Sequence, residues 1–332
     1  MIRQRVLVLG AGGFIGTRVV AALAASDWAI PIAATHRATP RYAGNVETTR
    51  LDATAAPAVA QALRGVAAVV NCVAGDAETI VAGARTLFNS CASMTPQPRV
   101  VHLSTISAYG TATGFLDETA PLRGDGDAYS AAKAEAERLA QVCASVVHLR
   151  PGIVYGPGSP IWSERIGQWL LSHRLGDLGA AGGGYCNLVH VDDVVEAILR
   201  TLRLPGIAGE AFNLSLTSAP TWNEYFRLYA EALGASFHSI SHQRLLLELA
   251  VLAPPLMLAE RAARLGRLRW QPPPPIRPWL MRLCRQRIRL DVRKAERVLD
   301  MKWTPLDRGL RDTAEQFRAQ FSAVRADHRI AR

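Results

Sequence analysis

A tyrosine and a lysine lie four residues apart in Tyr129-Ser-Ala-Ala-Lys133, at the start of a segment with helical composition. Residues at this spacing share one face of a helix, so the phenol and the ammonium would be neighbours. A neighbouring cation favours the phenolate and lowers the pKa of a tyrosine toward the range useful for proton transfer. An ordinary surface pair is the alternative. However, Lys133 is one of only three lysines among the 38 Lys+Arg residues, which points to a specific role for its compact ammonium.

A second segment rich in hydroxyl groups follows an apolar run and reads Ser104-Thr105-Ile106-Ser107-Ala108-Tyr109-Gly110. If the apolar run is a strand, Thr105 lies at its carboxyl end, where its hydroxyl could hold a substrate carbonyl or alcohol. Helix caps and turns use the same residue types. The segment therefore indicates a site only in combination with Tyr129 and Lys133.

A glycine cluster, Gly10-Ala-Gly12-Gly13-Phe14-Ile15-Gly16, stands between an apolar run and a helical segment. One glycine permits the tight turn, another lets the backbone approach a pyrophosphate, and the last allows close helix packing. The amides at the start of the helix and the helix dipole favour the phosphates. Because the cluster occupies the first turn of a β/α alternation, it predicts dinucleotide binding by Gly10, Gly12, Gly13, Phe14, Ile15 and Gly16.

The elements that would position these motifs alternate along the first half of the chain. Strands are predicted at Arg5–Leu9, Ala29–Thr35, Ala67–Cys72, Arg99–Ser104 and Val146–Leu149, and helices near Phe14–Ala25, Pro57–Leu63, Ala77–Ser93 and Ala128–Cys143. Strands that are apolar throughout and alternate with helices favour a parallel sheet covered on both faces. Ligands bind beyond the carboxyl ends of such strands. The predicted fold is α/β, a Rossmann-type doubly wound parallel sheet with a smaller C-terminal substrate-binding lobe.

The predicted division assigns residues 1–155 to the dinucleotide-binding domain, which also receives segments near 185–215. Residues 156–330 form mainly the substrate-binding lobe, because Gly and Pro break the β/α pattern after Arg150.

Together the three motifs resemble the extended short-chain dehydrogenase/reductases, the NAD(P)-dependent epimerase/dehydratase family. Further phrases of this family are similar to Leu149-Arg-Pro-Gly-Ile-Val-Tyr-Gly-Pro-Gly158, Leu188-Val-His-Val-Asp-Asp193, Gly209-Glu-Ala-Phe-Asn-Leu214 and Met301-Lys-Trp-Thr-Pro-Leu-Asp-Arg-Gly-Leu310. The resemblance implies that Tyr129 is the catalytic acid/base, Lys133 its partner and ribose anchor, and Thr105 the hydroxyl that orients the substrate. It also implies further cofactor contacts from Asp52, Ala53, Val73, Ala74, Pro151 and Ile153. His190 is expected to be architectural.

The expected cofactor is NADP(H), with NAD(H) as the alternative. A carboxylate after the second strand would bind the ribose hydroxyls of NAD, whereas an arginine accommodates a 2′-phosphate. The chain has Thr35-His36-Arg37 and then Arg41, with no carboxylate before Glu47. His36 and Arg37 are therefore the predicted 2′-phosphate contacts.

The leading functional hypothesis is an NAD(P)-dependent oxidoreductase that transfers hydride between nicotinamide and a carbonyl or alcohol substrate. A nucleotide-sugar epimerase or dehydratase is the alternative. It is weakened by Cys186-Asn187, because relatives that act on nucleotide sugars often carry Arg-Asp there, with the arginine on the pyrophosphate. Arg282 or Arg289 could replace that contact. A non-catalytic dinucleotide-binding subunit is a lesser alternative, since such relatives lose the Tyr/Lys pair.

The net charge of +10 is confined to Arg261–Arg297, which holds 12 Lys+Arg and 2 Asp+Glu; the rest of the chain is neutral. The partner is expected to be a small-molecule substrate and not a nucleic acid. Peripheral membrane contact through residues 245–297 and a homodimer are left open. No metal site, transmembrane helix or signal sequence is predicted. Five isolated cysteines fit a reducing cytoplasm.

Overall fold

The computed structural model describes residues 3–36, 42–44, 46–266 and 272–330. Its contacts divide the chain into two compact units. Unit 1 comprises Met1–Gly152, Val189–Thr217 and Leu290–Trp303, and unit 2 comprises Ile153–Leu188, Ser218–Arg289 and Thr304–Arg332. Each unit thus collects stretches that are far apart in the sequence.

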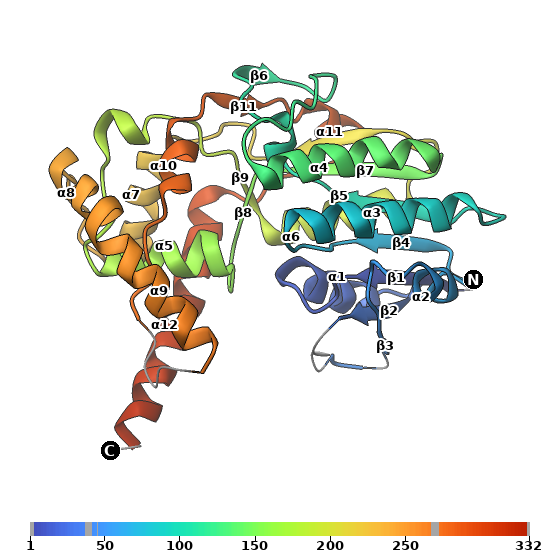
Figure 1. Cartoon of the computed structure of the whole chain (residues 1–332), viewed down its shortest axis with the longest axis horizontal. Coiled ribbons are helices and arrows are strands. Elements are labelled where there is room, and N and C mark those ends of the chain that lie inside the picture. Colours follow the sequence, from blue (N-terminus) through green and yellow to red (C-terminus); the bar gives the residue numbers. More distant parts are fainter. Residues whose placement is uncertain (1–2, 37–41, 45, 267–271, 331–332) are drawn as a thin grey trace. The chain divides into compact units, whose positions relative to one another are not determined.

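Unit 1 is built on a seven-stranded parallel sheet with the strand order β10-β7-β5-β4-β1-β2-β3 (Figure 1). The strands are β1 (Gln4–Leu9), β2 (Ala29–Thr35), β3 (Glu47–Arg50), β4 (Ala68–Asn71), β5 (Arg99–Leu103), β7 (Val146–Pro151) and β10 (Ala211–Leu214). The predicted doubly wound parallel sheet is confirmed. Two strands that were not predicted, β3 and β10, form its edges.

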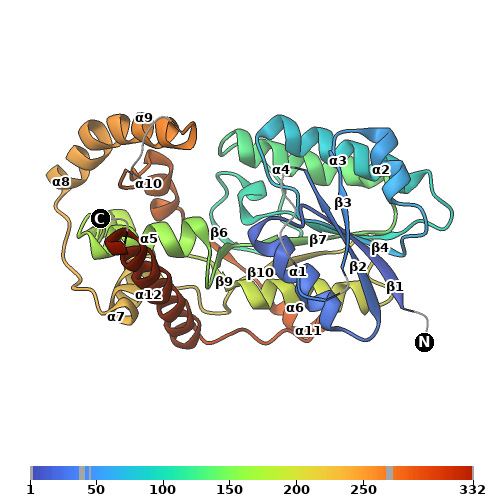
Figure 2. The ribbon, with the colours of Figure 1, turned by 90° about the horizontal axis from the view of Figure 1, so that it is seen from below.

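Helices cover both faces of the sheet, as Figure 2 shows. On one side α2, α3 and α4 pack in sequence, and on the other α1 packs against α6. The helices of unit 1 are α1 (Phe14–Ala25), α2 (Ala56–Ala62), α3 (Ala77–Ala92), α4 (Ala128–Leu139), α6 (Val191–Arg203) and α11 (Arg293–Val298), with 3₁₀ turns at Ile106–Tyr109 and Ala140–Val142 and a short strand β6 (Gly114–Leu116). Central strand β1 is buried from Val6 to Leu9, because a sheet covered on both faces leaves no solvated side.

Unit 2 is mainly helical. Its helices are α5 (Ile166–Leu171), α7 (Trp222–Leu233), α8 (His242–Leu246), α9 (Ala253–Arg264), α10 (Pro278–Arg285) and α12 (Leu306–Ile330), with π-helical turns at Pro160–Arg165 and Leu247–Leu252 and a 3₁₀ turn at Gly179–Gly182. Three short strands stand where the sequence passes from one unit to the other. They are β8 (Ile153–Tyr155), β9 (Leu188–His190) and β11 (Ile288–Leu290).

The core of unit 2 is aromatic and lies along one face of α7. Trp222, Tyr225 and Tyr229 are buried, and the rings of the two tyrosines stack with centroids 6.0 Å apart. Thr221 and Glu224 form a capping box that fixes the start of this helix. None of the helices in the described part of the chain combines the length and hydropathy that a bilayer crossing requires.

Candidate active site

The first βα turn brings the backbone of β1, β4 and α1 very close together. Gly10 has φ +74°, and a Cβ there would lie 2.6 Å from the Cys72 carbonyl oxygen. At Gly16 a Cβ would lie 2.3 Å from the Gly10 carbonyl oxygen. Both positions therefore require glycine, because any larger residue would collide with backbone that has little room to move.

The start of α1 is open to an anion. Its N-cap is Gly13, which has no side chain to bond the first amides, and the first turn contains no acidic residue. Phe14 and Ile15 are half-buried beneath this turn, whereas Gly12 is exposed. Uncapped amides and the helix dipole suit a pyrophosphate, so this turn fits the dinucleotide that the sequence predicts.

The next site residue, Thr105, follows the carboxyl end of β5. Its Oγ1 accepts a hydrogen bond from the Ser107 amide at 3.2 Å and so caps the 3₁₀ turn. The same side chain is hydrogen-bonded to Tyr129. The capping and functional interpretations of Thr105 are therefore compatible in this fold.

Tyr129 and Lys133 lie on the first turns of α4, which begins after the N-cap Asp127. The Lys133 ammonium is 6.0 Å from the centroid of the Tyr129 ring and donates to the Leu103 carbonyl oxygen at 2.8 Å. Tyr129 is 41% exposed, whereas Lys133 is buried. The fold thus gathers Thr105, Tyr129 and Lys133 at one end of unit 1.

The proton affinities of this pair depart from the expectation. Although Tyr129 is partly exposed, the atoms around its phenol displace water and raise its pKa, and the hydrogen bond from Thr105 only partly opposes this. Desolvation lowers the pKa of Lys133 to about 8, while the neighbouring Cys72 and Glu137 act to raise it. The net direction of the tyrosine pKa is therefore opposite to the predicted lowering, because desolvation of the phenolate is the larger effect.

A buried ion pair beneath α4 was not predicted from the sequence. Glu137, one turn after Lys133, accepts bonds from the Arg150 guanidinium, with Nη2 to Oε2 at 2.7 Å and Nε to Oε1 at 3.0 Å. Arg150 also donates to the Tyr109 hydroxyl at 3.0 Å, and that hydroxyl donates to Asn213 Oδ1 at 2.7 Å. This network joins α4 to β7 and β10. The spacing Lys133-x-x-x-Glu137 places a carboxylate one turn after the lysine, but no local pattern in the sequence indicates Arg150 as its partner.

On the adenine side of the predicted site, Asp52 is exposed and is held by its own loop. Its Oδ1 accepts from the Thr54 amide at 2.9 Å and from the Thr54 hydroxyl at 2.8 Å, which lowers the pKa of this carboxyl. Ala53 lies against Gly83 of α3. Val73 and Ala74 follow β4, where Val73 is half-buried and Ala74 is exposed, and the Val73 amide donates to Asn71 Oδ1 at 3.2 Å.

At the end of β2, the exposed His36 accepts a bond from Arg50 Nε at 3.1 Å through its carbonyl oxygen. Arg50 ends β3 opposite Thr35, and sequence reasoning did not single it out. Glu47 begins β3 and is held by Arg5 through two bonds of 2.7 Å. Arg37 and Arg41 lie outside the described residues.

The remaining predicted cofactor contacts, Pro151 and Ile153, stand where the sequence passes from unit 1 to unit 2. Pro151 is the buried last residue of β7 in unit 1, and Ile153 is the buried first residue of β8 in unit 2. Within unit 2, Cys186 and Asn187 are both buried, and Asn187 Nδ2 donates to the Ile288 carbonyl oxygen at 2.8 Å. These two side chains serve packing in unit 2.

His190 is the N-cap of α6, where its Nδ1 accepts from the Asp192 amide at 3.3 Å. All five cysteines are free. In the described ranges no group of three or more His, Cys, Asp or Glu residues could hold a metal ion.

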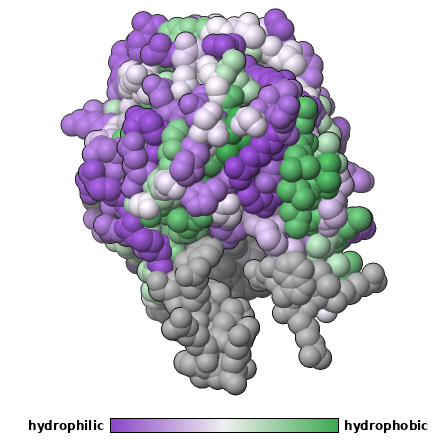
Figure 3. Space-filling model, turned by 90° about the vertical axis from the view of Figure 1, so that its left-hand side faces the viewer, coloured by the Kyte–Doolittle hydropathy of each residue, from purple (hydrophilic) through white to green (hydrophobic). Residues whose placement is uncertain are grey.

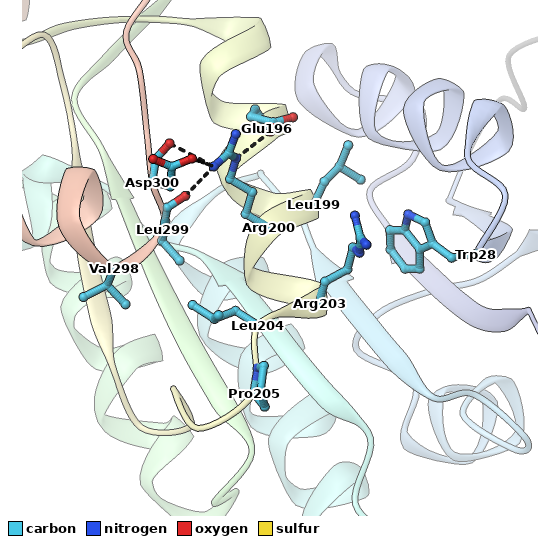
Figure 4. Close-up of a pocket in the computed structure, with 10 residues that line it drawn as sticks. All are labelled: Trp28, Glu196, Leu199, Arg200, Arg203, Leu204, Pro205, Val298, Leu299 and Asp300. Carbon is cyan, nitrogen blue, oxygen red and sulfur yellow. Dashed lines mark hydrogen bonds and ion pairs between the residues drawn. The ribbon is translucent and has the colours of Figure 1, made fainter. Parts of the chain in front are cut away.

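A hollow of about 480 Å³ in unit 1 lies elsewhere (Figure 4). It is bordered by Trp28, by residues from the end of α6, by Leu204 and Pro205 after this helix, and by Val298–Asp300. Arg203 lies 5.8 Å from the Trp28 ring centroid, and Arg200 binds Asp300 and Glu196. Trp28 precedes β2, so this hollow lies at the amino-terminal ends of the strands. Cofactors of doubly wound folds bind at the carboxyl-terminal ends.

Comparison with known sequences identifies a family. The sequence model of the NAD dependent epimerase/dehydratase family matches residues 6–215. No curated protein matches the chain significantly.

Solved structures are similar over nearly the whole chain. One, described as MoeE5 in complex with UDP-glucuronic acid and NAD, has 24% identity and a TM-score of 0.73, covering 95% of this chain and 99% of that one. The UDP-glucuronic acid 4-epimerase from Bacillus cereus, with UDP-glucuronic acid and NAD, has 18% identity and a TM-score of 0.71, covering 96% and 100%. The dTDP-glucose 4,6-dehydratase from Bacillus anthracis, with NAD, has 20% identity and a TM-score of 0.71, covering 95% and 97%. These similarities support the fold.

Proposed function

Because the chain belongs to the NAD dependent epimerase/dehydratase family, we propose that it transfers hydride between a nicotinamide and a carbonyl or alcohol carbon of a small substrate. Tyr129 is the acid/base. The main support for this proposal is the cluster of Thr105, Tyr129 and Lys133. Thr105 is hydrogen-bonded to Tyr129, and Lys133 is buried beside the Tyr129 ring. The glycine turn, which has no room for a Cβ at Gly10 or Gly16, fits a dinucleotide.

A nicotinamide held at this site would supply or accept the hydride. In the direction of alcohol oxidation, Thr105 orients the substrate hydroxyl and Tyr129 accepts its proton. In carbonyl reduction, Tyr129 donates that proton to the developing alkoxide. Lys133 is half neutral near pH 8, so its charge, and with it the anchor for the ribose hydroxyls, is greatest below this pH.

Replacing Tyr129 by Phe tests the mechanism. Without the phenol, turnover should fall by about 10²-fold or more, while binding of the reduced cofactor, followed by its fluorescence, should stay within about twofold. The assay monitors cofactor oxidation with a panel of ketones, aldehydes and sugar nucleotides. Full turnover in Tyr129→Phe would disprove the mechanism.

For the cofactor we propose a preference for NADP(H) over NAD(H), although the solved structures named above contain NAD. Glu47 is occupied by Arg5 and is a poor candidate for the ribose hydroxyls of NAD. Arg50 stands beside His36 with an exposed guanidinium, which suits a 2′-phosphate. Arg37 is part of the same prediction.

Paired titrations test this preference. In Arg50→Ala, affinity for NADPH should fall about tenfold, the effect of losing one charge-assisted contact, and affinity for NADH should not change. Arg64→Ala provides the control, because this arginine is exposed on another loop. Equal or tighter binding of NADH by the unmodified protein would contradict the preference.

A second candidate is epimerisation or dehydration of a nucleotide-linked sugar, favoured by the UDP-sugars in structures that match 95–96% of the chain. Burial of Cys186 and Asn187 weighs against a pyrophosphate contact by that pair, so Arg282 or Arg289 would have to supply it. Such an enzyme regenerates its cofactor in each turnover. Acid release of oxidised cofactor from the purified protein would support this candidate, and empty protein that consumes NADPH would support the reductase.

A further inference from the structure

The helical run 242–264 in unit 2 is formed by α8, a π-helical turn and α9. Its acidic side chains face inward, whereas its most exposed side chains are apolar. Between Arg244 and Glu260 its only charged residue is Glu248, and Glu248 is buried. The most exposed side chains of this stretch are apolar. We name the exposed Leu246, Leu247, Val251, Leu252, Met257 and Leu258 the apolar face.

The acidic groups of the run all turn toward their own unit. Glu248 accepts bonds from Arg174, with Nη2 to Oε2 at 2.7 Å. Glu260 binds both Arg277, at 2.8 Å, and Arg165. Ion pairs thus hold the inner face of the run, while the apolar side chains of the outer face are exposed to solvent. Val251 and Leu258 are 57% and 71% exposed.

The charges bordering the apolar face are positive. Arg244 precedes it and Arg261 follows it, and both are exposed. A hollow lined by His242 and Arg285 brings the exposed Arg285 of α10 beside the start of the run. Figure 3 shows an apolar area next to strongly hydrophilic surface on this side of the molecule.

We propose that the apolar face and its flanking arginines bind the surface of an anionic lipid bilayer, with the helical run lying in the plane of the headgroups. Apolar side chains then enter the acyl boundary while arginines meet the lipid phosphates. The run lies on the bilayer and does not span it, in keeping with the absence of a spanning helix from the described residues.

A second copy of the chain fits this surface less well. A two-fold contact sets the same patch against itself, which would bring the arginines bordering the face, Arg244, Arg261 and Arg285, toward the same set of arginines on the second copy. Like charges at an interface rim oppose association. An anionic bilayer complements both the hydrocarbon and the charge.

Flotation of the full-length protein with vesicles tests the proposal, which does not depend on the proposed function. We expect the protein to float with vesicles of phosphatidylcholine and phosphatidylglycerol, to stay behind with phosphatidylcholine alone, and to be released by added salt. In the double variant Val251→Glu/Leu258→Glu the vesicle-bound fraction should fall about tenfold or more, because two apolar anchors become anionic.

The matched control is Val142→Glu, which alters a valine of similar exposure, 55%, in unit 1 and should float as the unmodified protein does. Circular dichroism and thermal unfolding verify that each variant is folded. Failure of the unmodified protein to float with either vesicle, or flotation of the double variant at the unmodified level, would overturn the proposal. So would a lipid-free dimer that the double variant converts to a monomer, which would assign the face to contact between copies.

Discussion

Helix α4 in unit 1 and the helical run 242–264 in unit 2 each carry a buried glutamate held by an arginine of the same unit. The pairs are nearly identical in geometry, with Nη2 to Oε2 distances of 2.7 Å for both Arg150–Glu137 and Arg174–Glu248. One turn before Glu137 stands the buried Lys133, whereas one turn before Glu248 stands the exposed Arg244. The ion pair anchors a helix in both units. The two helices differ in the preceding turn, which carries a buried lysine at the candidate site in α4 and an exposed arginine at the border of the apolar face in the run.

The largest expected effect on turnover comes from removing Lys133, which stands between the Arg150–Glu137 ion pair and Tyr129 along α4. In Lys133→Met, turnover should fall by about 10²-fold or more, because the ammonium next to the acid/base is lost. Lys302→Met, which alters an exposed lysine of the same unit, should retain full turnover. Steady-state assays at saturating cofactor measure both, and equal activity of the two variants would remove Lys133 from the proposed site.

Replacing either buried glutamate breaks its ion pair. Glu137→Gln and Glu248→Gln should each lower the free energy of unfolding by about 3–5 kcal/mol, because each removes a buried carboxylate from a guanidinium that is itself largely shielded from water. Only Glu137→Gln should also alter the pH profile of turnover. Glu137 raises the pKa of Lys133, so without it the alkaline loss of activity should begin at a lower pH. Denaturant unfolding and pH–rate profiles measure the two effects; a matching profile shift in Glu248→Gln would contradict this distinction.

A smaller effect is expected in the pH dependence of the free energy of unfolding, to which Lys133 should make an identifiable contribution. Its pKa is about 8 in the folded protein and 10.5 as the ordinary value, so between pH 8 and pH 9 the unfolded chain binds more protons. Stability should therefore rise with pH in this window, by up to about 1 kcal/mol. The rise should disappear in Lys133→Met and persist in Lys302→Met. Unfolding at pH 8 and pH 9 measures it.

The smallest expected effect concerns the outer face in unit 2. Val251→Ser should change the free energy of unfolding by less than about 0.5 kcal/mol, since its side chain is largely exposed. By contrast, Val147→Ser at a fully buried position of β7 should cost several times more. Equal losses in denaturant unfolding would mean that the apolar face is covered within its own unit.

Much of the sheet could be predicted because its strands are apolar runs between clear breakers. Ala29–Thr35 and Phe14–Ala25 have the predicted bounds. The edge strand β3 could not be found in this way, because Glu47–Arg50 is polar and largely exposed and its pairing with β2 is a tertiary property. The helix predicted to reach Cys143 ends at Leu139 and continues as a 3₁₀ turn.

The candidate site shows the same limit. Local motifs indicated Thr105, Tyr129 and Lys133, since each motif carries its own chemistry. The partnership of Glu137 with Arg150 requires β7 to lie beneath α4, and the position of Arg50 beside His36 requires the β2–β3 register. The direction of the Tyr129 pKa depends on how many surrounding atoms displace water, which spacing alone does not reveal.

The discontinuous assembly of unit 1 has a consequence for synthesis on the ribosome. Every strand of the sheet except β10 has been synthesised once residue 151 is made, but β10 follows only after Ile153–Leu188 of unit 2 and helix α6. Until then β7 is an open edge of the nascent sheet, with unpaired backbone groups that other chains could bind. Arrival of Asn213 both closes this edge and supplies the acceptor for the Tyr109 hydroxyl. Completion of the N-terminal sheet is thereby coupled to translation of the first part of the other unit.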